Sequence, residues 1–507
     1  MASKIFMGDM PELMEIILNN LNDEFYSLYS CTLVSRHWCK MSIPILWQNP
    51  FSFINNNQNP LFISQYFSSL DENEKFILKE CGIHIKFPNT LFNYAKFLKV
   101  LDLSSLETKV EEWVDFQNVH VSSNRSYKSL EYHICNSLFK LFVESGATLH
   151  KLDLYFSDYG INPEIFYSLG ENKIFFSQLQ DLSLYLGPIS DLNIENAIAL
   201  LKILAKNVTE LYTLKLDEFY SGYESQLFHS LVCIIKSQEQ LRQFSLVGGG
   251  FPTEFYGIIS ALENQSNSLQ EVIIESCAFN TEFKVLMNCK NLEILRIKDC
   301  NDVNILETGL NTLEITSYMI CASSIVKILE KSGTLLQRLK LVSTYDKLWE
   351  EPLLLETLKS SCPNITYLNI SDVGFSAQYL ELIGNLQKLQ FLTLWYVDYI
   401  LEDEPEIQII QFAKLLPLTL QYLDLRYSCL SSYIDILLNN CNAPLKNLLI
   451  DRLDDEKKAK ALIEFCIRKR SLNYVGVEKS WNLDDNIKKE VEEYITFMPC
   501  GRIVVNC

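Results

Sequence analysis

The residues that could carry out chemistry in this chain are its histidines and its cysteines. The six histidines show no metal-ligand spacing, and no two of the fifteen cysteines form a Cys-x-x-Cys pair. The chain has no Gly-x-x-x-x-Gly-Lys-Ser/Thr loop, no His-Glu-x-x-His motif and no Gly-x-Ser-x-Gly motif. The sequence therefore predicts no catalytic residue, no cofactor and no metal site.

Two acidic pairs and one basic triplet have simple structural interpretations. Asp454-Asp455 and Asp484-Asp485 are typical of helix starts or solvated loops. Arg468-Lys-Arg470 lies where a helix is predicted to end, and cations there favour the helix dipole. The alternative for this triplet is a localisation signal.

Bulk composition excludes several classes of protein. The chain has 507 residues, too many for one compact core, with 48% hydrophobic and 21% charged residues, which is a globular composition. Its net charge of −19 makes nucleic acid an unexpected partner, because phosphate binding needs a basic face. We find no apolar run of the ~18 residues that span a membrane and no signal peptide. With scattered, reduced thiols, the expected location is the cytoplasm, the nucleus or both.

A six-residue pattern with apolar residues at its first, fourth and sixth positions recurs through most of the chain, as in Leu420-Gln-Tyr-Leu-Asp-Leu425. From the second occurrence to the last, the spacing averages about 27 residues. The fourth and sixth positions are two apart, so both point to the same face of a strand and should be buried. The pattern begins at Leu98, Leu149, Leu179, Leu211, Leu241, Leu269, Leu292, Leu310, Leu336, Ile365, Leu389, Leu420, Leu445 and Leu472.

Amphipathic helical stretches, such as those around residues 324–330 and 379–383, lie between these patterns. One strand and one helix alternate, which predicts an α/β fold with parallel strands. The recurrence resembles leucine-rich repeats over roughly residues 98–480. The resemblance implies a curved solenoid with concave strands and outer helices. Cys277 and Cys300 take the ninth position, where these repeats place Cys or Asn, so we expect buried turn residues rather than nucleophiles or ligands.

The first fifty residues follow a different pattern. Asp9, with Glu12 three residues later, can cap a first helix, and two further amphipathic stretches follow. Three short helices cannot bury this much apolar surface alone, because small domains are marginally stable. We therefore expect part of the surface to contact a partner. The apolar residues of the first stretch are Leu13, Ile16, Ile17 and Leu21.

Met10-Pro-Glu-Leu-Met-Glu-Ile-Ile-Leu18, Leu33-Val-Ser-Arg-His-Trp-Cys39 and Ile45-Leu-Trp47 together resemble an F-box. The family pattern is roughly Leu-Pro-x-Glu-Ile/Leu, Val-Cys-Arg-x-Trp and a terminal Leu-Trp. This chain departs from it with Met10 for the first Leu and Ser35 for the Cys. The resemblance covers about residues 8–50 and implies docking to the Skp adaptor of a cullin-RING ubiquitin ligase. The residues that would carry this docking are Met10, Pro11, Leu13, Ile16, Ile17, Leu21, Leu33, Val34, Trp38, Leu46 and Trp47.

The alternative for the first fifty residues is an ordinary helical cap on the repeats, with Trp38 and Trp47 as its core. At the other end, a helix from Leu483 to Ile495 and a short strand from Arg502 to Cys507 are expected to cover the open end of the solenoid. The predicted domains are an F-box at 1–50, a helical adapter that packs onto the first repeat at 51–97, the repeat solenoid at 98–480 and a C-terminal cap at 481–507.

The positions between the buried leucines are expected to face the concavity. The middle of this stripe is predicted to be basic, with Arg296, Lys298, Arg338 and Lys340. The later part is aromatic, and exposed aromatic residues beside charges suit protein recognition. The alternative is that these aromatic residues pack on one another or under capping loops. The residues predicted to bind a protein target are Tyr367, Phe391, Trp395, Tyr422, Asp424 and Arg426.

Three functions remain open at this point. The first, which we favour, is a non-catalytic subunit of a Skp–cullin–F-box ubiquitin ligase whose repeats hold a protein target. The second is a binding scaffold whose F-box-like helices cap the solenoid or bind Skp alone. The third is an enzyme, which no sequence motif supports.

Overall fold

The computed structural model describes most of the chain, and the statements below concern the described residues. The residues that lie outside this description are 1–10, 23, 53–59, 81–82, 84–89, 118–126, 157–161, 163–164, 166–167, 171, 188–190, 220–224, 250–256, 279, 301–308, 319, 321, 344–350, 396–404, 480–484 and 507.

The chain folds into two compact units. The first comprises residues 1–249 and 255–265, and the second comprises residues 250–254 and 266–507. Both units contain parallel strands that follow one another in chain order, with helices or loops between them.

The first unit begins with three helices, α2 (Pro11–Asn19), α3 (Phe25–Thr32) and α4 (Arg36–Leu46). Ser35 caps α4, because its Oγ accepts a hydrogen bond from the backbone N–H of Trp38 at 3.2 Å. Ser35, one of the two residues that depart from the F-box pattern, thus starts this helix. The small core of these helices consists of Met14, Leu18, Leu28 and Ile45.

The next segment holds short helices, as expected for a helical adapter. The ring of Phe67 lies 5.0 Å from that of Trp113, whose Nε1 donates to Ser64 Oγ at 3.0 Å. This segment therefore packs on α7 (Leu103–Phe116), the helix that follows the first repeat strand. These elements are η2 (Pro60–Ile63), α5 (Ser64–Phe67), α6 (Glu72–Glu80), η3 (Tyr94–Phe97), α7 (Leu103–Phe116) and α8 (Tyr127–Glu144).

The first unit continues with five parallel strands and their connecting helices. The fourth position of each repeat pattern pairs with the fourth position of the next, as Leu152 does with Leu182. The strands are β1 (Val100–Asp102), β2 (Lys151–Tyr155), β3 (Asp181–Tyr185), β4 (Thr213–Phe219) and β5 (Gln243–Gly248), and the helices are η4 (Lys173–Phe176), α10 (Asp191–Asn207), α11 (Ser225–Ser237), α12 (Ile258–Ala261) and η5 (Leu262–Gln265).

The described part of the second unit contains ten parallel strands. As in the first unit, the fourth position of one pattern pairs with the fourth position of the next. Leu368 on one strand pairs with Leu392 on the next, which pairs with Leu423 on the third. The strands are β6 (Glu271–Glu275), β7 (Ile294–Lys298), β8 (Thr312–Ser317), β9 (Arg338–Ser343), β10 (Tyr367–Ile370), β11 (Phe391–Thr393), β12 (Tyr422–Asp424), β13 (Asn447–Ile450), β14 (Tyr474–Val477) and β15 (Thr496–Phe497).

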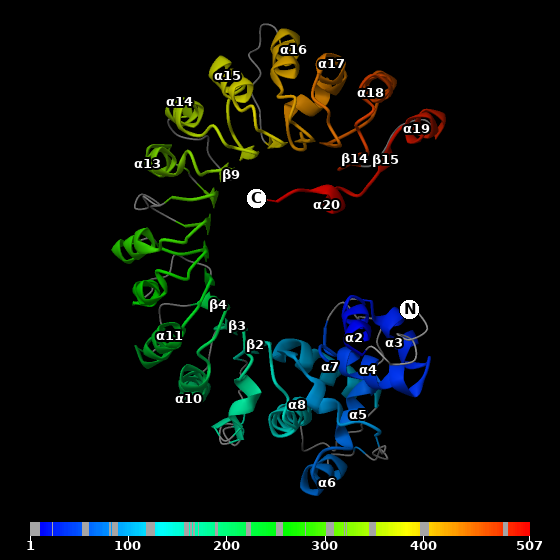
Figure 1. The fold of residues 1–507 in the computed structure, drawn as a ribbon, viewed down its shortest axis with the longest axis vertical. Helices are drawn as coiled ribbons and strands as arrows, with labels where there is room; N and C mark the ends of the chain where they lie inside the picture. Colours follow the sequence, from blue (N-terminus) through cyan, green and yellow to red (C-terminus); the bar gives the residue numbers. More distant parts are fainter. Residues whose placement is uncertain are drawn as a thin grey trace. The chain divides into compact units, whose positions relative to one another are not determined.

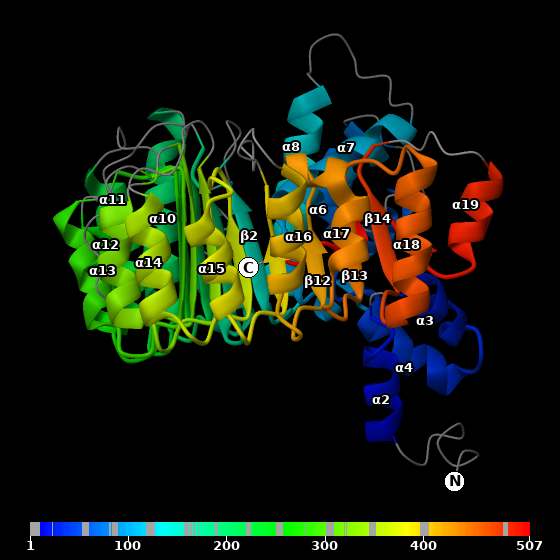
Figure 2. The ribbon, with the colours of Figure 1, turned by 90° about the horizontal axis from the view of Figure 1, so that it is seen from above.

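Helices α13 to α18 of the second unit line the outer side of these strands (Figure 1), and Figure 2 shows α14 to α18 side by side. This is the leucine-rich-repeat arrangement, so the predicted fold class is confirmed. The helices are η6 (Thr281–Asn288), α13 (Ala322–Ser332), α14 (Glu351–Ser361), α15 (Ala377–Asn385), α16 (Pro405–Leu415), η7 (Cys429–Tyr433), α17 (Ile434–Asn440), α18 (Glu456–Lys469), α19 (Asp485–Glu492) and α20 (Cys500–Ile503).

In five of the described repeats the backbone is left-handed at the eighth position of the pattern, at the end of the strand or shortly after it. Such a conformation is uncommon outside glycine, and Asp and Asn tolerate it best. It redirects the chain from the strand toward the ninth position, where Cys277 and Cys300 are buried as predicted. The residues with positive φ at this position are Glu218, Ser276, Asp299, Asp372 and Tyr427.

The C-terminal region differs in part from the prediction. Helix α19 lies within the predicted range 483–495. The strand predicted from Arg502 to Cys507 is wrong, because the chain forms the short helix α20 there and then becomes extended at Val504. The aliphatic residues Ile503, Val504 and Val505 pack across the strands of the unit instead of pairing with the edge of the sheet. The last strand, β15, lies earlier, beside β14.

We expect the column of stacked leucines to carry much of the stability of the second unit. Leu423 is fully buried and Leu418, five residues earlier in a turn, is 72% exposed. Leu423→Ala should lower the free energy of unfolding by about 2–5 kcal/mol through lost burial and the cavity left behind. Leu418→Ala, the same chemical change, should lower it by less than about 0.5 kcal/mol. Urea denaturation followed by circular dichroism measures both, and equal effects would contradict the assigned register.

Candidate functional site

Helix α2 is apolar on two sides, and only one of them is covered. Met14 and Leu18 are fully buried against α4 and its neighbours. Leu13, Ile16 and Ile17 lie on other sides of the helix and are 40%, 58% and 46% exposed. Helices in soluble proteins normally turn a polar face to water, so an uncovered apolar face marks a contact surface.

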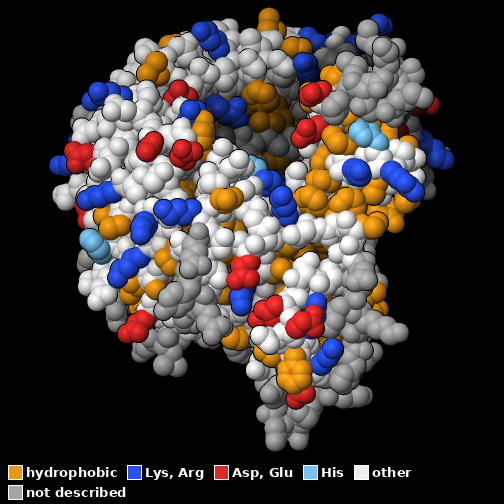
Figure 3. All heavy atoms as spheres, turned by 60° about the horizontal axis from the view of Figure 1, so that its bottom comes forward, with side chains coloured by type: hydrophobic (Ala, Val, Ile, Leu, Met, Phe, Trp, Pro, Cys, Tyr) orange, Lys and Arg blue, Asp and Glu red, His pale blue; other side chains and the backbone are white. Residues whose placement is uncertain are grey.

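The turn between α3 and α4 adds to this uncovered surface. Leu33 and Val34 are 72% and 63% exposed, and Tyr26 and Tyr29 of α3 are also exposed. Hydrophobic side chains gather toward the right of the view in Figure 3, where these helices lie, with basic side chains among them. We call Leu13, Ile16, Ile17, Leu33 and Val34 the N-terminal apolar face.

Other residues that the F-box resemblance assigned to docking lie at least partly inside the first unit. Trp47 stacks on Tyr94 with ring centroids 4.1 Å apart, and its ring also lies 5.2 Å from Tyr66. Met10 and the side chain of Pro11 lie outside the described residues. The docking roles stay predictions, and the residues placed partly in internal packing are Leu21, Trp38, Leu46 and Trp47.

A second candidate surface lies on the strand side of the second unit. The register places Arg338, Tyr367, Phe391 and Tyr422 next to one another on β9 to β12. These residues occupy the third position of their repeats and follow one another across the strands. The sequence prediction that the aromatic residues lie on adjacent strands is therefore confirmed for Tyr367, Phe391 and Tyr422, whereas Trp395 lies just beyond the end of β11.

The expectation that this surface is exposed is wrong for four of the six predicted target-binding residues. Tyr367 and Tyr422 are each 1% exposed, while Phe391 and Trp395 are half-buried. The two tyrosines are covered by the C-terminal segment, in which Ile503, Val504 and Val505 pack against the cluster around Tyr422 and Val505 contacts Tyr367. Asp424 and Arg426 are paired with each other. This outcome is close to the alternative that the aromatic residues lie under a capping segment. The four buried residues are Tyr367, Tyr422, Asp424 and Arg426, and the target-binding role of all six stays a prediction.

A buried ion pair holds one end of this surface. Arg426 donates from Nε and Nη2 to the two carboxylate oxygens of Asp424 at 3.0 and 2.9 Å. Its Nη1 donates to Glu478 at 3.1 Å, which lowers the pKa of that carboxyl below its ordinary value although burial opposes the shift. Asp424 is 1% exposed, so its charge depends on Arg426 for compensation.

Trp395 lies beside this pair. The guanidinium of Arg426 lies 5.7 Å from the centroid of the Trp395 ring, a cation–π distance, and the Tyr427 ring meets Trp395 edge-on at 6.1 Å. The indole Nε1 of Trp395 is buried and has no hydrogen-bond partner among the described residues. The side chains of Trp395 and Arg426 are therefore held by packing and charge together.

Three of the four residues of the predicted basic middle are paired with acidic residues, whereas Arg338 contacts the carbonyl oxygen of Asn506. Arg296 pairs with Glu271 and with Glu314, and Lys340 also pairs with Glu314. Lys298 pairs with Glu275 at 2.5 Å. Glu275 and Glu314 stand directly opposite their basic partners on the neighbouring strands, whereas Glu271 lies two residues before the position opposite Arg296. The charges of these three basic residues are therefore compensated within the strand face.

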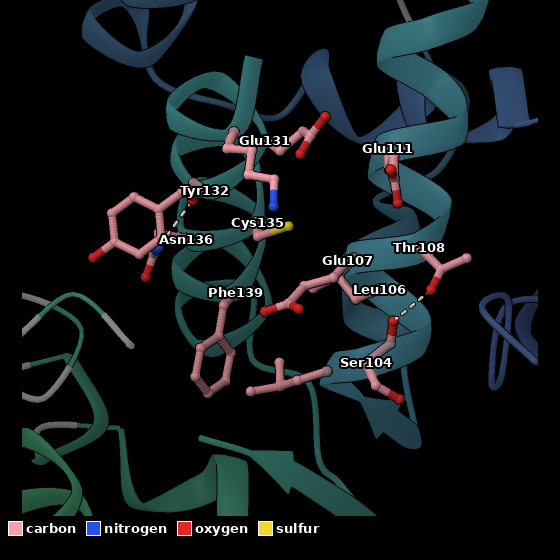
Figure 4. A pocket seen from close by; sticks show the side chains of 12 residues that line it. Ser104, Leu106, Glu107, Thr108, Glu111, Glu131, Tyr132, Cys135, Asn136 and Phe139 are labelled. Carbon is pink, nitrogen blue, oxygen red and sulfur yellow. Dashed lines mark hydrogen bonds between the residues drawn. The ribbon is translucent and has the colours of Figure 1, made fainter. Parts of the chain in front are cut away.

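A cavity of about 330 Å³ lies between α7 and α8 in the first unit. Glu107 and Cys135 reach into the space between the two helices (Figure 4). Burial raises the pKa of Glu131, and the nearby carboxylates of Glu111 and Asp115 raise it further. Such an acidic lining disfavours anionic ligands.

Several buried thiols are poorly suited to nucleophilic chemistry. Burial raises the pKa of Cys289, Cys441 and Cys466 to about 11 in each case, so these thiols are poor nucleophiles at neutral pH. Within the described ranges, no group of three or more His, Cys, Asp and Glu side chains is arranged to hold a metal ion. No helix described here has the length and apolar composition that crossing a bilayer requires.

Sequence reasoning missed three residues of the strand-side surface. Val505 and Asn506 contact it from the C-terminal segment, and Gly476 makes room for that segment. A glycine inside a strand pattern is a known sign of close approach by another part of the chain. That signal was present at Gly476, whereas nothing local in residues 503–506 predicts where they pack.

Together the strand register and the outer helices define a leucine-rich-repeat type of α/β protein with an N-terminal helical region. No protein-family model matches the chain, and no curated protein sequence matches it. Solved structures with some similarity include the yeast complex of Rad7 and Elc1, at 15% identity over 78% of this chain and 86% of that one, with a TM-score of 0.36. Others are a protein from Bacteroides fragilis, at 15% identity over 64% and 75% with a TM-score of 0.30, and a TLR13–ssRNA13 complex, at 14% over 69% and 57% with a TM-score of 0.35.

We expect the buried ion pair to show strong coupling. Arg426→Met leaves the Asp424 carboxylate buried without its partner and should lower the free energy of unfolding by about 3–5 kcal/mol. Combining it with Asp424→Leu removes both charges and should restore much of that loss. Urea denaturation of the two single variants and the double variant measures the coupling. Lys460→Met, which breaks an exposed pair with Glu456, is the control and should leave the unfolding midpoint unchanged. Additive effects in the cycle would contradict the assigned pairing.

Proposed function

We propose that this protein recruits a target protein to a Skp–cullin–F-box ubiquitin ligase. Helices α2, α3 and α4 dock the Skp adaptor, and the strand side of the repeats binds the target. The chain itself performs no catalysis, and other subunits transfer ubiquitin. Such a complex would act in the cytoplasm, the nucleus or both.

The observation that carries this proposal is the N-terminal apolar face. Five large aliphatic side chains are between 40% and 72% exposed on helices that already have their own small core. An internal cap would be expected to turn such residues inward, whereas an adaptor-docking domain needs them outward. The resemblance of this region to an F-box names the class of partner that fits.

We expect single charges on the N-terminal apolar face to prevent docking. Ile16→Asp and Leu33→Asp should each weaken binding to a purified Skp-type adaptor at least about tenfold, because a central contact residue contributes about 2 kcal/mol or more. Both side chains are exposed, so the variants should fold. Titration of the adaptor against the full chain measures the affinity.

Leu418→Asp is a matched control for this experiment. Leu418 and Leu33 are each 72% exposed, but Leu418 lies in a turn of the second unit. The control should bind the adaptor as the wild type does. If the folded wild-type chain retains neither Skp nor cullin on co-purification, the proposal is wrong. Retention of Skp without cullin would favour the scaffold alternative.

A further inference from the structure

The chain's own residues 503–506 lie on the surface predicted to bind the target. We call these four residues the tail. After β15 the short helix α20 turns the chain back. The end of α20 and the residues after it lie on the strand side of the second unit, inside the row of outer helices (Figure 1). The tail crosses several strands instead of running alongside one of them.

Among the described residues, three side chains of the strand side form hydrogen bonds with the tail, and all three contact its backbone. Tyr367 donates its hydroxyl to the carbonyl oxygen of Val505 at 3.4 Å. The N–H of Val505 donates to the hydroxyl of Tyr422 at 3.4 Å. Arg338 Nη2 donates to the carbonyl oxygen of Asn506 at 2.6 Å. Any extended peptide presents these same backbone groups, so the contacts do not depend on the tail's own sequence.

The side-chain contacts define what kind of peptide fits. Val504 and Val505 pack with the cluster of Tyr422 and Leu449 and with the half-buried ring of Phe391. The Arg338 guanidinium lies 4.7 Å from the centroid of the Tyr367 ring, so the polar and apolar contacts come from adjacent residues. A floor of aromatic and aliphatic side chains with polar groups for the backbone suits an extended aliphatic segment.

One residue of the floor is fitted to the tail's approach. A Cβ placed on Gly476 would lie 3.0 Å from both Cys500 Sγ and Ile503 Cδ1. This is closer than ordinary van der Waals contact, so a larger residue would push α20 and the start of the tail away. The strand therefore presents a glycine where the returning chain passes.

The tail is held less firmly than the repeats beneath it. Residues 503–506 are all described and belong to no strand. Ile503, Val504 and Val505 are only half-buried, and Asn506 is exposed. Two of the three hydrogen bonds that strand-side side chains make to it are at the long end of hydrogen-bond distances. Segments with few buried contacts open at a small fraction of the free energy of global unfolding.

We propose that the strand side of β9 to β13 is a peptide-binding groove for an extended aliphatic segment of the target protein, and that the tail occupies it as an intramolecular competitor. The target gains the groove only by displacing the tail. This inference rests on the proposed target-binding role of the strand side and is independent of adaptor docking.

The tether sets the strength of this competition. A short intramolecular tether gives an effective concentration on the order of 1 mM. A free peptide that binds the open groove with a dissociation constant of about 10–100 μM would therefore bind the closed protein roughly 10- to 100-fold more weakly. A target with a longer aliphatic segment, which makes more contacts, overcomes that factor.

The test uses a fluorescent peptide with the sequence of residues 501–506, Gly-Arg-Ile-Val-Val-Asn. Fluorescence anisotropy compares its binding to the full chain and to a chain that ends at Ile503. The shortened chain should bind it at least 10-fold more tightly. A peptide with Asp in place of both valines should bind neither chain. Tyr367→Phe and Tyr422→Phe in the shortened chain should each weaken binding, because each removes one hydroxyl that contacts the peptide backbone.

Two full-length variants guard against loss of folding in the shortened chain. Val505→Asp weakens the tail while keeping its length, and Gly476→Val obstructs its approach without changing its sequence. Val505→Asp should raise the affinity for the peptide as shortening does. Arg502→Ala, at an exposed residue of α20, should leave the affinity unchanged. Thermal unfolding shows whether each variant is folded.

The proposal is overturned if folded shortened and full-length chains bind the peptide equally, or if neither binds it. Preference of the open groove for the Asp-substituted peptide would overturn the aliphatic class of partner. Adaptor titration on the same proteins keeps the two proposals apart, because its result does not depend on the tail.

Discussion

The side-by-side stacking of one apolar residue on the next, strand after strand, is the constraint on which both units depend. In each pattern the fourth position pairs with the fourth position of the neighbouring strand, as Leu214 does with Phe244 and Leu423 does with Leu448. Side chains alternate between the two faces of a strand, so a shift by one residue would turn the whole apolar set toward water. The buried column therefore fixes the register of every residue that faces the other way.

Of the two candidate surfaces, the strand side of the second unit follows from this register, whereas the N-terminal apolar face does not. Because the third positions of β9 to β12 are adjacent, three aromatic rings and one guanidinium form a continuous row, and that row contacts a peptide backbone. The buried pair of Asp424 and Arg426 lies at one end of the row, and the alternating charges around Glu314 lie on earlier strands of the same face. The N-terminal helices do not belong to the repeats. Their apolar residues have no equivalent neighbour to stack on, and those of the N-terminal apolar face remain exposed.

Much of the repeat fold could be predicted from the sequence, since each predicted pattern start is followed by a strand two residues later. This worked because the signal is local and is repeated many times. The pairing of Arg296 with Glu271 and Glu314 could have been predicted, because these two acidic residues stand on the neighbouring strands. Such a prediction requires that the strand register be applied to acidic as well as basic residues. The position of the tail could not be predicted from the sequence, because Ile503, Val504 and Val505 resemble an edge strand in composition. Only the three-dimensional course of the chain after Pro499 shows that they cross the sheet instead.

The contact between Arg338 and Asn506 joins residues 168 positions apart, whereas hydrogen bonds between neighbouring repeats typically join residues 22 to 32 positions apart. Contacts close in sequence form early in folding, and those that close long loops form late. The tail reaches Tyr422, Tyr367 and Arg338 only when the intervening strands are present, in order and in register. A skipped or misaligned repeat between β9 and β14 would move these three side chains out of its reach. Contact between the tail and these side chains thus requires six successive strands to be correctly assembled.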